Sequence, residues 1–128
     1  MTKKWKIFER IIAKIYEIKL SDFKPEIKHN VILKGKSGAS HQIDVLVELS
    51  LPLINIREII EVKRWQSRVK KSVVMQINEI TDDVNANRAT IISRKGFQKG
   101  AIQYATHHGI NLYRILTPKE LGVHTLYI

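Results

Sequence analysis

The chain has 128 residues, and 44% of them are hydrophobic, which is enough for the core of one domain without covalent cross-links. It contains no cysteine, which excludes disulfides and zinc–thiolate sites. Lysine and arginine number 22 against 12 acidic residues, and the resulting net charge of +10 predicts attraction to polyanions, nucleic acid first. No apolar run reaches the roughly 20 residues of a membrane span. We therefore expect a cytoplasmic, soluble domain without a membrane partner.

The first half of the chain predicts one helix followed by three strands. Residues 4–18 place apolar side chains at the 3.6-residue period of a helix. Strands are predicted over 28–33 and 42–49, with a loop rich in glycine and serine at 35–40 between them. A third strand ends at residue 63. These three strands most simply form an antiparallel meander.

The second half of the chain alternates helices and strands. A strand–helix–strand unit implies parallel pairing of its two strands. The order α-β-β-β-α-β-α-β therefore predicts one α/β domain over residues 1–128, with a mixed sheet and helices on both faces. The elements predicted here are a helix over 67–85 capped by Ser67, a strand at 90–92, a helix over 97–108, a strand over 110–115 and a turn of helix after Pro118.

Two of the apolar strands carry charged residues where a buried strand should carry none. Asp44 interrupts the strand 42–49, in which Ile43 and Val45 are expected on one face and Asp44 on the other. Glu61 and Lys63 interrupt the next strand, and residues two apart project from the same face of a strand. Asp44 and Glu61 can lie opposite each other across an antiparallel pair. The pattern predicts one shared site.

Two facing carboxylates repel each other, so their pKa values rise or a cation lies between them. A hard divalent ion with oxygen ligands resolves the conflict, and Mg²⁺ fits best, with the carbonyl of Val62 as a further ligand. Lys63 is placed to orient a water molecule or to stabilise charge on a phosphate. Phosphodiester hydrolysis needs these groups together. The alternative is a surface ion pair between Glu61 and Lys63, with Asp44 in solvent.

The first predicted helix contains an acid within its apolar stripe. Glu9 falls on the face that should meet the core, where a carboxylate needs a partner. The alternative is a glutamate at the border of the helix that turns out to solvent.

Basic residues suggest contacts with nucleic acid. Lys70 and Lys71 lie in the first turns predicted for the helix 67–85, where the helix dipole disfavours cations. They form either a patch for an external anion or an ordinary solvated surface. His41, close to Asp44 in sequence, is expected to touch a phosphate or to shape the preceding loop. Arg64, just past Lys63, is a candidate clamp on nucleic acid.

Two motifs together resemble a known nuclease family. Residues 37–44 read Ser-Gly-x-x-His-Gln-Ile-Asp, and residues 61–63 read Glu-x-Lys. This arrangement resembles the PD-(D/E)xK nuclease superfamily, and within it the Mrr-like restriction endonuclease branch. Residues 91–101 resemble the second βαβ portion of that branch, so the likeness covers about residues 8–114. It implies a restriction-endonuclease-like core and a metal-dependent DNA endonuclease that uses Mg²⁺, with Mn²⁺ able to substitute.

The resemblance also implies roles for individual residues. Asp44 matches the metal-binding aspartate, and Lys63 matches the catalytic lysine. Glu61 matches the position before the lysine, which many Mrr-like members fill with glutamine and the wider superfamily with an acid. Glu9 is similar in place to a glutamate of the first helix that assists the metal or its waters. Gln76 resembles a helix glutamine that some branches use near the phosphate.

The chain departs from many Mrr-like enzymes because no stretch is long enough for their winged-helix DNA-binding domain. Without that domain, sequence specificity could come from a separate DNA-binding subunit. Cutting both strands usually takes two sites, which suggests a homodimer. Two alternatives to a restriction-like enzyme share the fold: a structure-selective nuclease such as a junction resolvase, and a non-catalytic nucleic-acid-binding module.

Overall fold

The computed structural model describes residues 4–116, which form a five-stranded sheet with helices against it. The predicted order of helices and strands is confirmed, and the turn of helix predicted after Pro118 lies outside the described residues. The elements are α1 (Lys4–Lys19), the 3₁₀ turn η1 (Ser21–Phe23), β1 (Glu26–Lys34), β2 (Ser40–Ser50), β3 (Asn55–Lys63), α2 (Lys71–Asp83), β4 (Arg88–Ser93), α3 (Lys99–His108) and β5 (Asn111–Arg114).

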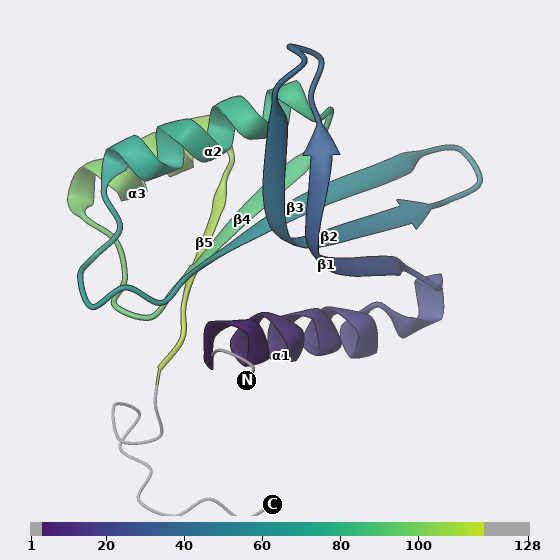
Figure 1. Cartoon of the computed structure of the whole chain (residues 1–128), viewed down its shortest axis with the longest axis horizontal. Coiled ribbons are helices and arrows are strands. Elements are labelled where there is room, and N and C mark those ends of the chain that lie inside the picture. Colours follow the sequence, from purple (N-terminus) through teal and green to yellow (C-terminus); the bar gives the residue numbers. More distant parts are fainter. Residues whose placement is uncertain (1–3, 117–128) are drawn as a thin grey trace, which may run out of the picture.

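The sheet is mixed, as predicted. Its strands lie in the order β1-β2-β3-β4-β5. The first three form the antiparallel meander, whereas β4 pairs parallel to both β3 and β5 (Figure 1). The carboxyl ends of β3 and β4 therefore meet at the same edge of the sheet, and the loops that lead into α2 and α3 start there.

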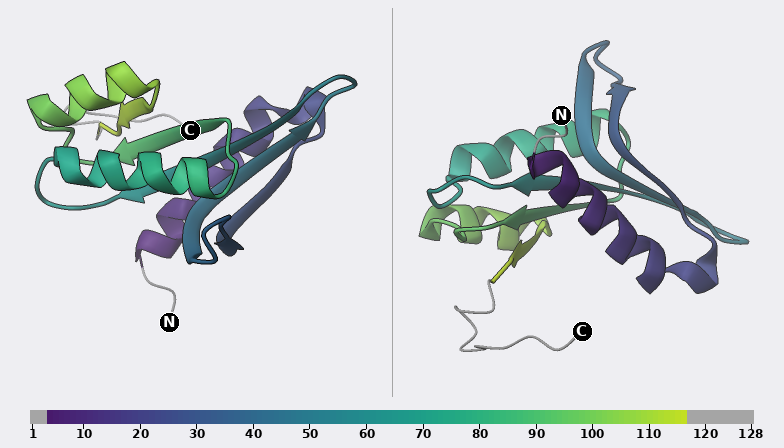
Figure 2. Two further views of the ribbon diagram at one scale, coloured as in Figure 1. Left: turned by 90° about the horizontal axis from the view of Figure 1, so that it is seen from above. Right: turned by 60° about the horizontal axis from the view of Figure 1, so that its bottom comes forward.

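Helix α1 covers one face of the sheet, while α2 and α3 cover the other (Figure 2). On the α1 face, the buried side chains of Ile12 and Ala13 belong to one cluster with Val45 and Ile60 of the sheet. The other face has a larger cluster, which burial of aliphatic surface stabilises. Its buried members include Ile43, Leu46, Ile59, Val74, Ile77, Ala89, Ile91, Ala101 and Ala105. Every helix within residues 4–116 is too short or too polar to span a membrane.

The regular alternation predicted for β2 is wrong on the N-terminal side of Asp44. Val45 packs on the α1 face, but Ile43 packs on the face of α2 and α3 instead of sharing the side of Val45. Opposite Asp44, Asn30 of β1 has a left-handed backbone with φ of 55°, and the pairing of the two strands skips this position. A break of this kind turns strands about their axes and bends them. The β1–β2 hairpin accordingly rises out of the sheet (Figure 1).

Helix α2 begins three residues later than predicted, because Lys70 rather than Ser67 is its N-cap residue and Lys71 its first helical residue. The preceding Val69 is fully buried and forms an isolated parallel bridge with Phe97. Its amide donates to the carbonyl of Gly96 over 2.9 Å, and its carbonyl accepts from the amide of Gln98 over 2.9 Å. Because these backbone groups are already bonded to the loop before α3, Val69 cannot join the helix.

Candidate active site

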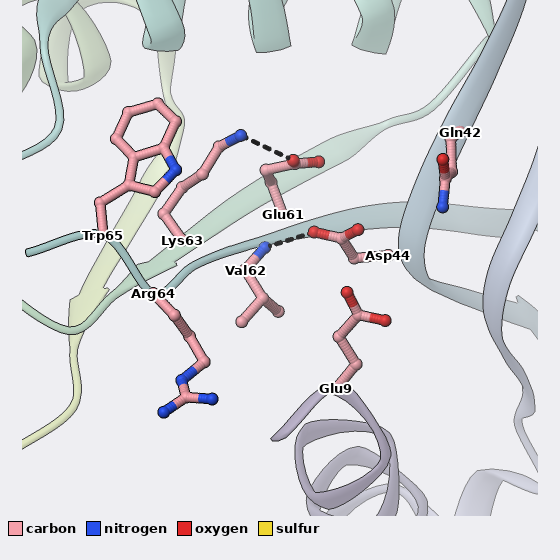
Figure 3. Close-up of a pocket in the computed structure, with 8 residues that line it drawn as sticks. All are labelled: Glu9, Gln42, Asp44, Glu61, Val62, Lys63, Arg64 and Trp65. Atoms are coloured by element: carbon pink, nitrogen blue, oxygen red, sulfur yellow. Dashed lines mark hydrogen bonds and ion pairs between the residues drawn. The ribbon is translucent and has the colours of Figure 1, made fainter. Parts of the chain in front are cut away.

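A pocket of about 440 Å³ opens where the β1–β2 hairpin bends away from β3 (Figure 3). The paired residues of β2 and β3 run only from Val45 opposite Ile60 to Ser50 opposite Asn55, so the last residues of β3 have lost their neighbour on β2. An unpaired strand edge leaves backbone groups and side chains accessible. The pocket is lined by Glu9, Gln42, Asp44, Glu61, Val62, Lys63, Arg64 and Trp65.

The Asp44 side chain bridges β2 and β3 where the backbone pairing of the two strands ends. Its Oδ2 accepts a hydrogen bond of 2.8 Å from the amide of Val62, which has no strand partner on that side (Figure 3). The carboxylate thereby satisfies a half-buried backbone donor and is held in one orientation. The prediction that Asp44 and Glu61 face each other across β2 and β3 is consistent with the register, in which Val45 lies opposite Ile60.

Glu61 and Lys63 lie side by side on β3, as their spacing predicts. The Lys63 Nζ is 3.1 Å from the Glu61 Oε1, and the two side chains are 21% and 19% exposed. The same ammonium lies 4.7 Å from the centre of the Trp65 ring. A carboxylate and an aromatic face together restrict where the ammonium can lie. Lys63 is therefore directed into the pocket and not outward into solvent (Figure 3).

Glu9 reaches the same pocket from α1. Its side chain is only 3% exposed, so the alternative of a glutamate turned out to solvent does not hold. The carboxyl group points toward Asp44 from the side of the helix (Figure 3). On the pocket rim, the Arg64 guanidinium lies 5.3 Å from the centre of the ring of Phe8, the residue before Glu9. This contact connects α1 to the end of β3.

Two of the carboxyl groups in the pocket, those of Glu9 and Glu61, have raised pKa values. Burial, together with the neighbouring Asp44, raises the pKa of Glu9 from 4.5 to about 7. Burial and Asp44 likewise raise the pKa of Glu61 from 4.5 to about 7, although Lys63 opposes the shift. An excess of buried negative charge is an environment that favours a cation.

The donor set suits a hard divalent ion with few protein ligands. Within residues 4–116, no three His, Cys, Asp or Glu side chains are placed to hold a metal ion between them. Two carboxylates with a backbone carbonyl remain available from Asp44, Glu61 and Val62. Mg²⁺ is commonly bound by one or two carboxylates and retains several waters, so such a set fits that kind of ion.

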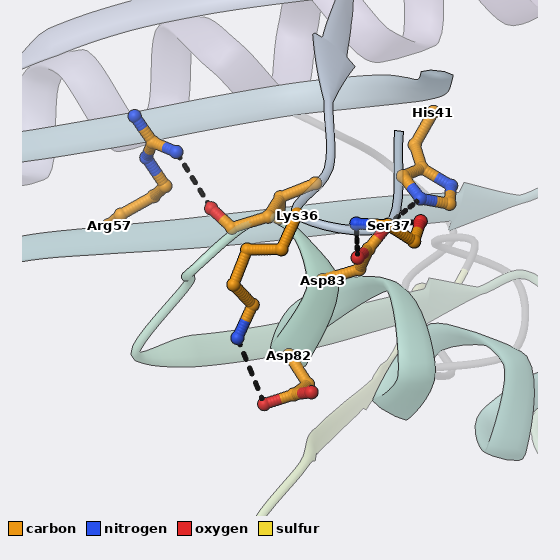
Figure 4. A network of polar contacts seen from close by, with 7 residues as sticks. Lys36, Ser37, His41, Arg57, Asp82 and Asp83 are labelled. Atoms are coloured by element: carbon orange, nitrogen blue, oxygen red, sulfur yellow. Dashed lines mark hydrogen bonds and ion pairs between the residues drawn. The ribbon is translucent and has the colours of Figure 1, made fainter. Parts of the chain in front are cut away.

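Four of the residues predicted to act at the site lie outside this pocket. His41 and Gln76 line a different cavity, between the β1–β2 hairpin and α2. There the His41 Nε2 lies 2.7 Å from the Asp83 Oδ2 (Figure 4), so of the two roles predicted for His41 the geometry favours shaping the loop. Lys70 and Lys71 are exposed at the start of α2.

Sequence reasoning missed three residues that matter to the site. Gln42 lines the pocket, and its nearness to Asp44 in the sequence was a usable signal. Asp83 and Ser37 fasten the hairpin, because the Asp83 carboxylate accepts bonds from the Ser37 amide at 2.8 Å and hydroxyl at 2.7 Å (Figure 4). No local pattern could reveal that contact, since its partners lie 46 residues apart.

The comparison with protein families agrees with this geometry. The Mrr_cat family model, described as restriction endonuclease, matches residues 2–117. The chain belongs to this restriction endonuclease family. The resemblance seen in the Ser-Gly-x-x-His-Gln-Ile-Asp and Glu-x-Lys segments is thereby confirmed. Membership indicates a nuclease catalytic domain. A comparison with curated protein sequences found no match.

Solved structures share the fold of this restriction endonuclease domain. The chain is similar to AF1548, a protein of unknown function, with a TM-score of 0.69 and 23% identity over 85% of this chain and 57% of that one. It is similar to VC1899 from Vibrio cholerae, with a TM-score of 0.68 and 19% identity over 91% and 30% of the two chains. It is also similar to MspJI restriction endonuclease, solved with a 27-mer oligonucleotide. The TM-score is 0.56 and the sequence identity 12%, over 88% of this chain and 26% of that one. The chain thus spans between about a quarter and three fifths of these proteins.

Proposed function

We propose that this chain is a metal-dependent DNA endonuclease that hydrolyses phosphodiester bonds with Mg²⁺. The observation that carries the proposal is the convergence of Glu9, Asp44, Glu61 and Lys63, from three separate elements, in one open pocket. Membership of a restriction endonuclease family supports nuclease chemistry, and the net charge of +10 supports a polyanionic substrate.

Asp44 and Glu61, with the carbonyl of Val62, are the groups that would hold the ion. Mg²⁺ bound there supplies Lewis-acid stabilisation of the scissile phosphate. The hydrogen bond from the Val62 amide orients the Asp44 carboxylate. Glu9, buried next to Asp44, is in reach to accept hydrogen bonds from waters in the pocket, which is the supporting role the family resemblance implies for it.

Lys63 is the residue that we propose acts on the reacting atoms. Its ammonium, held between Glu61 and Trp65, can donate to the attacking water and stabilise negative charge on the phosphate. Arg64 and Trp65 at the mouth of the pocket are placed to contact the nucleic acid, through a charge and an aromatic face respectively. Trp65 is 43% exposed, which leaves its ring accessible to a base.

The test is a cleavage assay with purified protein on linear duplex, branched and single-stranded DNA, in Mg²⁺, Mn²⁺ or EDTA. We expect cleavage of linear duplex with either metal and none in EDTA. Asp44→Asn purified in parallel controls for contaminating nucleases. Selective cutting of branched DNA would instead identify a junction-resolving enzyme. Tight DNA binding with no cleavage of any substrate in either metal would overturn the proposal in favour of a binding module.

Two related proposals concern assembly. The described residues contain one pocket of this composition, so we propose that cutting both strands requires two copies of the chain. A supercoiled plasmid distinguishes the cases, because a pair of copies linearises it directly, whereas a single copy accumulates the nicked circle. We further propose that sequence preference comes from an additional DNA-binding subunit, since the pocket itself offers few side chains that could read bases.

A further inference from the structure

The loops that lead into α2 and α3 are joined into one surface beside the pocket. Val69 and Phe97 form a parallel bridge, and hydrogen bonds of 2.9 Å connect Val69 with both Gly96 and Gln98. The Ser93 hydroxyl fixes the second loop, since it accepts from the Gly96 amide at 3.1 Å and donates to the Gly96 carbonyl at 3.0 Å. The two loops run next to each other at the ends of β3 and β4 (Figure 1).

Besides Arg64 and Arg94, five basic residues lie on these two loops and the helix starts that follow. We call this surface the basic platform. It consists of Arg68, Lys70, Lys71, Lys95 and Lys99. A Cβ on Gly100 would lie 3.8 Å from the Lys71 Cβ, so the first turns of the two helices touch and bring both sets of cations together. Four of the five are exposed, and Lys95 is half-buried.

The platform is separated from the acidic residues of the chain. Residues 62–78 and 84–116 contain no aspartate or glutamate at all. None of the five cations forms an ion pair with an acid among residues 4–116, whereas lysines elsewhere do, as in the pairs Lys14–Glu17 and Lys28–Glu26. The positive charge of the platform is therefore not neutralised by any acid within residues 4–116 and is available to an anion from elsewhere.

The stability of the fold does not account for this arrangement. Neighbouring cations repel each other, and Lys70, Lys71 and Lys99 stand at helix starts, where the helix dipole also disfavours positive charge. Neither helix has an acid in its first turn to offset the cost. A bound polyanion would reverse the sign of both effects.

We propose that the basic platform binds the phosphate backbone of the DNA that enters the pocket, on the flank next to the end of β3. This rests on the proposed function. Continuity with the pocket supports a nucleic acid as the ligand: the first loop begins with Arg64 and Trp65, which line the pocket, and the Arg94 amide of the second loop donates to the Lys63 carbonyl over 3.0 Å. A backbone held in the pocket therefore continues directly onto the platform.

The experiment compares two triple variants with the same change in net charge. The platform variant is Lys70→Gln, Lys71→Gln and Lys99→Gln. The control variant is Lys19→Gln, Lys24→Gln and Lys34→Gln, which removes three exposed lysines on other elements. Binding of a labelled duplex is measured by fluorescence anisotropy in EDTA over a range of salt concentrations. Omitting the metal prevents cleavage, so the result does not depend on whether the chain is a nuclease.

Each phosphate contact contributes about 0.9 to the slope of log affinity against log salt. We expect the platform variant to lose about 2–3 from the wild-type slope and the control variant less than about 1. Equal losses in the two variants would mean that only bulk charge matters and would overturn the proposal. No loss in the platform variant would also overturn it.

A second measurement separates binding from chemistry. If the wild-type protein cleaves DNA, the platform variant at saturating DNA should cleave in a single turnover within about threefold of the wild-type rate. A fall of about 100-fold under saturation would place these lysines in the chemistry and contradict a role in holding the flanking backbone. If the wild-type protein does not cleave, the proposed function fails. The salt slopes still show whether the basic platform binds DNA.

Discussion

At the scale of single residues, the pocket brings three carboxyl groups close to one ammonium group. Asp44, Glu61 and Glu9 supply carboxyl groups, and Lys63 supplies an ammonium that lies within hydrogen-bond distance of only one of them, Glu61. Asp44 is the shared neighbour, since it raises the pKa values of both other acids. Removing Asp44 therefore changes the electrostatics of the whole pocket and not only one ligand.

We predict that Asp44→Asn and Glu61→Gln each abolish cleavage while the fold is retained. Each amide keeps the shape of the acid but lowers its affinity for a divalent ion, so we expect a loss of at least about 10³-fold in rate. Because repulsion among the carboxylates is relieved, the melting temperature of the metal-free protein should hold or rise. Plasmid cleavage and thermal unfolding test the two parts, and a variant that cuts at the wild-type rate would show that the site is misassigned.

Lys63 distinguishes a catalytic role from simple charge pairing. We predict that Lys63→Ala still binds metal and DNA but hydrolyses on the order of 10²-fold or more slowly, the usual effect of losing one preorganised electrostatic group. If Lys63 only paired with Glu61, the alanine variant would bind metal as well or better and would keep its rate. The measurement is the single-turnover rate at saturating DNA and metal.

Lys63→Arg is the matched control for that prediction. It keeps the positive charge but replaces the compact ammonium with a planar guanidinium. We expect it to bind DNA as the wild type does but not to restore the rate, because the guanidinium cannot occupy the same position between Glu61 and Trp65. Near wild-type cleavage by the arginine variant would contradict a role for Lys63 in positioning water.

At the scale of elements, the β1–β2 hairpin is fastened to the end of α2. The Asp83 carboxylate accepts a hydrogen bond from the Ser37 hydroxyl and lies 2.7 Å from the His41 Nε2 (Figure 4). It also occupies space that only a glycine at position 35 leaves open, because a Cβ there would collide with the Asp83 carboxylate. The hairpin carries Asp44 three residues beyond His41. Fastening the loop therefore also positions one wall of the pocket.

Two adjacent aspartates allow this connection to be tested. Asp83 is 17% exposed and bonded to the hairpin, whereas Asp82 is 88% exposed and pairs only loosely with Lys36 at 3.7 Å. We predict that Asp83→Asn lowers the melting temperature by about 2–5 °C and slows cleavage, while Asp82→Asn changes neither. Equal effects of the two substitutions would show that the contact does not fasten the hairpin.

The pH dependence of the same contact has a defined sign. Hydrogen bonds from His41 and Ser37 lower the pKa of Asp83 from 3.8 to about 2. The stabilisation is therefore fully present above pH 3.8 and is lost as the pH falls toward 2. The difference in melting temperature between wild type and Asp83→Asn should narrow over that interval.

At the scale of the whole molecule, the pocket lies across the contact between α1 and the sheet. Glu9 belongs to the helix, while Asp44 and Glu61 belong to the sheet, so their repulsion opposes the packing of the two layers. The pKa values of Glu9 and Glu61 are raised from 4.5 to about 7, so this contribution favours the folded state below pH 4.5 and is lost as the pH rises through 7.

We predict that the metal-free protein melts at a lower temperature at pH 8 than at pH 5, and that Mg²⁺ or Ca²⁺ reverses the difference at pH 8. A ligand that binds only the folded state stabilises it by mass action, by about 2.7 kcal/mol at 100 times its Kd. Asp44→Asn is the control, because it should show a weaker dependence on both pH and metal. The same metal response in wild type and Asp44→Asn would place the ion elsewhere.

Much of the site follows from the sequence, because its signals are local. Residues two apart on a regular strand share a face, which places Glu61 beside Lys63 on β3. Hydrophobic periods of 3.6 and 2 residues similarly determine the order of helices and strands. The stripe of α1 that contains Glu9 also turns that acid inward, although its partner could not be named from the stripe alone.

Features that depend on contacts between distant segments could be seen only in the folded structure. Asn30 interrupts the β1–β2 ladder, and the resulting bend both opens the pocket at Asp44 and carries His41 away to Asp83. Pairing of Val69 with the loop before α3 decides where α2 begins. These partners lie from 14 to more than 40 residues apart. Their energies come from packing and hydrogen bonds that exist only once the sheet has formed, so no local pattern of residues encodes them.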